Sequence, residues 1–82
     1  MLIKVLAAET NLGSATNVGS ATVVKILNNQ GSADQVIRKD SDGNVIGSFT
    51  LAGNEVAYVE KVASDTLEGG SNIKAAKVAY GN

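Results

Sequence analysis

The stretch that decides the fold is residues 40–51, DSDGNVIGSFTL, in which a turn leads directly into a strand. The Asp-Gly pair favours a tight reversal, because glycine accepts a positive φ and aspartate side chains accept hydrogen bonds from nearby backbone N–H groups. Residues 45–51 then alternate as a β-strand, in which we expect Phe49 to be the central core residue. Gly47 interrupts this strand, which predicts either a β-bulge or a close backbone approach.

Segments of similar character lie on both sides of this stretch. Of the 82 residues, 20 are Val, Ile or Thr, and Gly, Asn and Ser cluster between the short apolar runs, a pattern typical of an all-β protein. The turn at 30–32 predicts a hairpin between the strands that flank it, and residues 63–71 are expected to form a surface loop. The other expected strands are residues 2–8, 21–28, 33–39, 55–62 and 73–80.

The last of these segments fits two structures. Its apolar residues follow helical spacing behind a possible cap at Asn72, but eight residues are few for a helix without strong packing. A strand is favoured, with a bulge at 75–76 that would gather Ile73, Val78 and Tyr80 on one face. The sequence therefore predicts one domain over residues 1–82, a small antiparallel β-sandwich or barrel of about six strands.

A direct repeat separates the first two expected strands: NLGSAT at 11–16 is followed by NVGSAT at 17–22. Stacked hexapeptide repeats need at least three copies to bury a continuous core, so two copies do not indicate a β-helix. We interpret the repeat as a connection of small residues that lies over the sheet.

The composition excludes several functional classes. The chain has no His and no Cys, so it lacks the commonest general base, the usual zinc ligands and the best neutral-pH nucleophile. We therefore expect no enzymatic activity and no cofactor. A net charge of −1 favours neither nucleic acid nor an anionic membrane surface, and the apolar runs are far below the ~20 residues of a membrane span.

Two acidic features invite a binding role. Asp40, Asp42 and Asn44 alternate like the first ligands of a calcium loop, but Val45 and Leu51 stand where an EF-hand needs Gly and Glu. We expect a plain hairpin turn there, and no metal site. The acidic stretch from residue 55 to residue 68 is expected to be an exposed edge, with docking onto a basic partner as the alternative.

Several segments together resemble small virion structural proteins of tailed bacteriophages, especially those that infect marine cyanobacteria. The resemblance spans nearly the whole chain as a pattern of strand and turn residues, without a diagnostic chemical motif. The segments that carry it are ATVVKILNN (21–29), IGSFTL (46–51), YVEK (58–61), SDTL (64–67) and IKAAKVAY (73–80).

The resemblance implies a non-enzymatic protein of the virion, assembled in the host cytoplasm, that acts as a capsid decoration or cement protein. Its partner would be the major capsid protein or another virion protein, with self-association on the particle also open. A small tail, neck or baseplate component is the close alternative, and a stand-alone carbohydrate- or peptide-binding module is the alternative of another class. We expect the interface in the repeat and the last segment, at Leu12, Val18, Ile73, Val78 and Tyr80.

Overall fold

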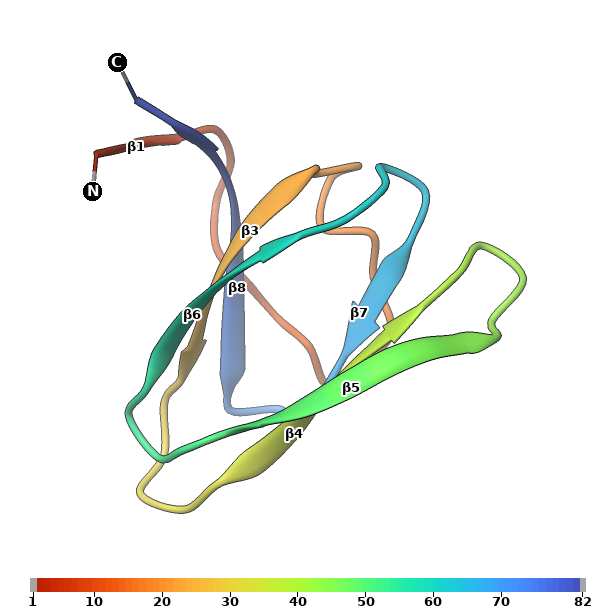
Figure 1. Cartoon of the computed structure of the whole chain (residues 1–82). Helices are drawn as coiled ribbons and strands as arrows, with labels where there is room; N and C mark the ends of the chain where they lie inside the picture. The colour runs from red at the N-terminus through yellow and green to blue at the C-terminus, as the bar shows by residue number, and fades with distance from the viewer. Residues whose placement is uncertain (1, 82) are drawn as a thin grey trace.

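The chain folds into eight strands arranged in two antiparallel sheets (Figure 1). This computed structural model describes residues 2–81, and those residues contain no helix. An all-β fold is therefore confirmed. The strands are β1 (Ile3–Val5), β2 (Thr10–Asn11), β3 (Val23–Asn28), β4 (Asp34–Lys39), β5 (Val45–Leu51), β6 (Val56–Glu60), β7 (Thr66–Glu68) and β8 (Ile73–Tyr80).

The larger sheet has β8 and β3 in its middle. Its order is β1-β8-β3-β6, and β2 pairs with β8 on the same side as β1. The smaller sheet has the order β5-β4-β7. The two sheets face each other across a common core, as in a β-sandwich (Figure 1).

The last segment is the strand β8 and not a helix. It pairs with β3 along one side and with β1 and β2 along the other, which explains why eight residues hold their conformation. The expected bulge at Ala75 and Ala76 is wrong, because these residues face Ile26 and Lys25 in an uninterrupted register. Simple alternation places Ile73 and Ala75 in the core.

The hairpin expected across residues 30–32 is also wrong. β3 and β4 belong to different sheets, so this turn carries the chain from one sheet to the other. The turn from β5 to β6 makes the reverse crossing beside it, so closely that a Cβ on Gly53 would lie 2.6 Å from the carbonyl carbon and oxygen of Gly31. A side chain at Gly53 would therefore push the two crossings apart.

Asn28 forms hydrogen bonds inside the protein to both turns that cross between the sheets. Its buried side-chain amide Nδ2 donates hydrogen bonds to the backbone oxygens of Ser32, Leu51 and Ala52, at 2.8, 3.0 and 3.2 Å. Asn28 belongs to the larger sheet and Leu51 ends a strand of the smaller one. One side chain thus links the two layers where both crossings occur.

The hairpin predicted from DSDGN is present between β4 and β5. One oxygen of Asp40 accepts hydrogen bonds from the backbone N–H groups of Asp42 and Asn44, both at 2.9 Å, and Gly43 takes a φ of 86°. The predicted bulge is also present: Arg38 faces Gly47 while Lys39 faces Val45, so one residue of β5 is extra. Gly47 itself has open space around it, which excludes the close-approach interpretation.

The core is aliphatic, but Phe49 is not its centre. Phe49 points to the same face as the buried Val36 opposite it, yet 37% of its surface stays exposed. The reason is that β5 is an edge strand that no other strand covers. The largest fully buried apolar side chains are instead Leu12, Ile26, Leu51, Leu67, Ile73, Val24 and Val36.

Candidate docking groove between two edge strands

Four of the five residues expected at the interface lie inside the protein. Leu12, Val18, Ile73 and Val78 are all buried, whereas Tyr80 is 53% exposed. The expectation that these four present a surface to a partner is therefore wrong. Ile73 and Val78 belong to a strand with neighbours on both sides, and Leu12 and Val18 place their side chains in the core.

The repeat closes one side of the sandwich. Leu12 donates a backbone hydrogen bond to Ile73 of the larger sheet at 2.9 Å, and its own oxygen accepts one from Gly69 at 2.8 Å. Thr16 exchanges a pair of backbone hydrogen bonds with Leu67 of the smaller sheet, at 3.1 and 2.9 Å. Residues 10–18 thus bridge β8 to β7, and we call this flank the closed side.

Within the described residues 2–81, no comparable bridge spans the opposite flank. β5 is the edge of the smaller sheet and β6 the edge of the larger one, and each has a partner on one side only. The two strands leave their connecting turn in diverging directions (Figure 1). We call this flank, between β5 and β6, the open side.

A groove of about 240 Å³ opens between these two edges. Its deep wall is apolar: Val36 and Leu67 are buried, Val59 is half-buried, and the Phe49 ring lies partly exposed on the β5 wall. Polar atoms come from Arg38, Ser48 and Glu60, and Ile46 and Gly47 complete the lining.

The surface of β5 beside the groove is unusually apolar for an edge. All its residues from 45 to 50 are exposed, and Ile46, the extra residue of the bulge, is 50% exposed. Natural edge strands are commonly protected by charges or proline. Residues 45–51 contain neither, and their one protecting feature is the bulge at Ile46, so the backbone of residues 47–51 and the side chains of β5 are open to a partner.

Arg38, which lines the groove, and the nearby Lys39 and Lys61 already have partners within the protein. Arg38 donates from Nε and Nη2 to one oxygen of Asp65, at 2.8 and 2.6 Å, and Lys39 pairs with Glu68 at 2.5 Å. Lys61 is buried and donates from Nζ to the backbone oxygen of Ala21 at 2.6 Å. Burial lowers the pKa of Lys61, although the Asp65 carboxylate opposes this effect.

One carboxylate lines the groove, and three more lie in the turns at the two ends of β5. Glu60 lines it from β6, Asp40 and Asp42 lie in the turn before β5, and Glu55 lies in the turn after it. Hydrogen bonds from the backbone, above all from the N–H of Asn44, lower the pKa of Asp40 and keep this carboxyl ionised. The open side is thus apolar within and acidic around its edge.

The geometry of the DSDGN turn is that of an Asx turn. The Asp40 carboxylate is taken up by N–H groups of its own loop, and the Asn44 side chain donates to it as well. Within residues 2–81, no three acidic side chains gather in a way that could hold a metal ion. The same residues contain no helix able to cross a membrane.

The sequence indicates only part of the open side. Its pattern places Phe49 in the core and gives Ile46 no role, and it includes Glu60 only in the alternative that the acidic stretch from residue 55 to residue 68 docks onto a basic partner. The available signal was a strand with apolar residues on both faces and no protecting charge, which describes either a central strand or an exposed edge. Comparison of the chain with protein-family models, with curated proteins and with solved structures found no match.

Proposed function

We propose that the protein is a non-enzymatic structural component of a phage particle, a decoration protein that binds the capsid surface through its open side. The observation that carries this proposal is the open side itself. There an edge strand without charge or proline lies beside an apolar groove, on a domain whose opposite flank is closed by its own chain. Exposed apolar surface of this kind is typical of an interaction site.

Two further considerations support the proposal. The pattern of strand and turn segments resembles small virion proteins over nearly the whole chain. A particle lattice also presents many copies side by side, so a contact of modest area at each copy gives strong overall attachment. The major capsid protein is then the proposed partner.

The groove also supports a second function, that of a peptide-binding module. None of the three aromatic rings is buried: Phe49, Tyr58 and Tyr80 all remain partly exposed, and Phe49 lines the groove. Aromatic side chains provide anchors for a bound chain. A role in a tail, neck or baseplate would use the same surface toward a different virion protein.

The test is co-sedimentation of the purified protein with particles of the phage that encodes it. We expect saturable binding in a fixed ratio to the major capsid protein. Ile46→Lys, which places a charge on the open side, should reduce the bound amount at least tenfold. Val5→Lys is the matched control, because Val5 is 71% exposed on β1, at the far edge of the larger sheet.

Three results would each argue against this function. These are the absence of binding to particles, binding without a fixed ratio, and equal loss of binding in both variants. Saturable binding to isolated tails but not to capsids would favour the tail alternative.

A further inference from the structure

We propose that the partner enters the open side as an extended segment of alternating apolar and basic side chains, which adds to the smaller sheet as a new strand beside β5. This inference rests on the proposed function insofar as it concerns the same surface. It goes further in naming the conformation and the chemistry of the partner.

The backbone of β5 provides the first step. Because β4 occupies only one of its sides, alternate N–H and C=O groups of β5 point away from the sheet. An extended chain satisfies such groups by strand addition, which gives affinity without dependence on sequence. Residues 47–51, which follow the bulge at Ile46, contain neither charge nor proline and leave this route open.

The groove provides the second step. In an added strand, successive side chains alternate between the two faces of the sheet. Those that share the face of Phe49 and Val36 would enter the groove and cover Phe49 and Val59. At about 240 Å³ the groove is smaller than the ~300–1,000 Å³ of a small-molecule site, and it suits individual apolar side chains of a bound segment.

Charge provides the third step. Carboxylates stand at both ends of β5 and across the groove, at Asp40, Asp42, Glu55 and Glu60, whereas Arg38 is paired with Asp65. Electrostatic complementarity therefore favours basic side chains at the positions of the segment that face away from the groove or flank it.

The same charges disfavour a second copy of this chain. Antiparallel pairing of β5 with β5 of another copy would bring the turn holding Asp40 and Asp42 beside the turn holding Glu55, at both ends of the contact. Like charges placed together lower affinity. A segment from a different, basic protein has no such repulsion.

Synthetic heptapeptides test the inference on the full chain. One probe alternates Lys and Val, and its control alternates Glu and Val; both are acetylated and amidated so that terminal charges are absent. We expect the Lys peptide to bind at least tenfold more tightly than the Glu peptide. Its amide chemical-shift changes should fall on β5 and on the residues that line the groove, and binding should weaken as salt is raised.

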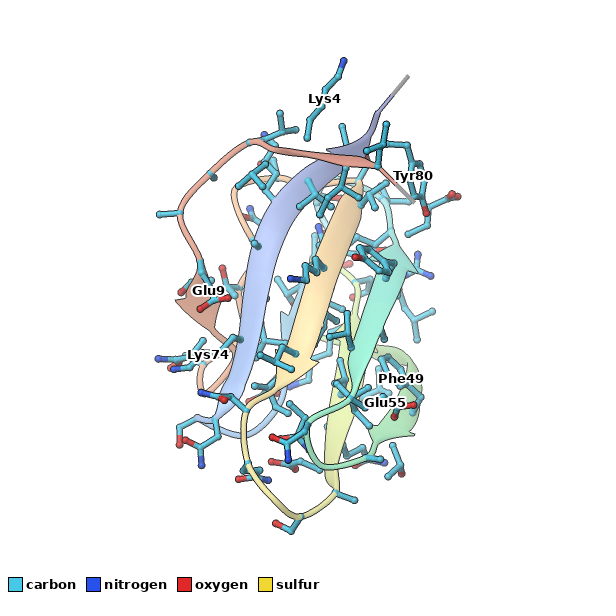
Figure 2. The ribbon with its side chains drawn as sticks, turned by 90° about the vertical axis from the view of Figure 1, so that its left-hand side faces the viewer. Lys4, Glu9, Phe49, Glu55, Lys74 and Tyr80 are labelled. Atoms are coloured by element: carbon cyan, nitrogen blue, oxygen red, sulfur yellow. The ribbon has the colours of Figure 1, made fainter. Side chains whose placement is uncertain are left out.

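Charge reversal at two acidic residues locates the binding. Asp42→Lys, in the turn that precedes β5, should weaken the Lys peptide at least fivefold and strengthen the Glu peptide. Glu9→Lys is the matched control, because Glu9 is exposed and lies on the opposite side of the molecule from Phe49 and Glu55 (Figure 2).

The inference is overturned if the Lys peptide does not bind, if both variants weaken it equally, or if its shift changes lie away from β5. Dimerisation of the free protein that is abolished by Ile46→Lys would also overturn it, in favour of a second copy. Particle binding without peptide binding would contradict this inference and support the proposed function. Peptide binding without particle binding would support this inference and contradict the proposed function.

Discussion

The closed and open sides of the sandwich differ in how the gap between the edges of the two sheets is covered. On the closed side, residues 10–18 bridge β8 to β7 and bury Leu12 completely. On the open side, β5 and β6 remain unbridged, and Phe49 stays partly exposed. The least patterned part of the sequence thus completes the core, whereas the best-patterned strand presents a surface. Strand pattern and structural importance are separate properties in this chain.

Leu12→Ala tests the closed side and should have the largest effect. Removing a fully buried Leu side chain leaves a cavity in the core, and we expect a loss of about 2–5 kcal/mol in the free energy of unfolding. Urea denaturation measures this loss. Leu2→Ala is the control, since Leu2 is exposed and its truncation should change stability by less than about 0.5 kcal/mol. Equal effects of the two substitutions would mean that the repeat does not complete the core.

Asn28→Ala tests how the layers stay together at the two crossings beside the open side. The substitution leaves three backbone oxygens without their buried donor, and we expect a loss of about 1–3 kcal/mol. Asn29→Ala, at an exposed neighbouring position, is the matched control and should be close to neutral. Thermal unfolding of the three proteins measures both effects, and a neutral Asn28→Ala would contradict the proposed link between the sheets.

Phe49→Ala should have a smaller effect on folding than Leu12→Ala, although it removes a larger side chain. The ring is partly exposed beside a groove that already exists, so we expect a loss of about 1–2 kcal/mol, below the ~3–5 kcal/mol of a fully buried Phe. The same denaturation series measures it. A loss as large as that of Leu12→Ala would show that Phe49 contributes to stability as a core residue does, and would contradict the distinction between the two sides.

The buried Lys61 gives the smallest effect, seen only as a dependence on pH. Its pKa is lowered in the folded protein from 10.5, so between the folded value and 10.5 the unfolded chain binds more protons. Stability should therefore rise as the pH increases through this window. Lys61→Met removes the titrating group, and its melting temperature should lack this part of the rise. The comparison uses the slope against pH, because the substitution also removes the hydrogen bond to Ala21.

Local chemistry explains which features were predictable from the sequence. The hairpin at residues 40–44 and the bulge beside Gly47 depend on side chains and glycines within a few residues of each other. The hairpin was predicted, and the bulge was one of the two alternatives predicted for Gly47. The short strands β2 and β7 were missed. Each depends on pairing with a segment distant in the sequence: β2 with β8, and β7 with β4.

The errors about the site have the same origin. Nothing local distinguishes Leu12, which is buried by segments around residues 67–73, from an apolar residue in an exposed loop. Likewise, an apolar strand such as β5 has the same pattern at the centre of a sheet and at its edge. β5 is an edge strand because β3 and β4 lie in different sheets. The turn between β3 and β4 has the composition of an ordinary hairpin, so nothing in the sequence indicates this separation.

The pairing of β1 and β2 with β8 has a consequence for the rate of folding. Of the eight strands, these two come first in the sequence and their partner comes last. Until β8 pairs, residues 10–18 have only β7 to contact, and the apolar side chains of β3 lack a neighbour on one side. The closed side therefore forms only when distant segments meet, as in the pairing of Ile3 with Tyr80, and such non-local pairing slows folding.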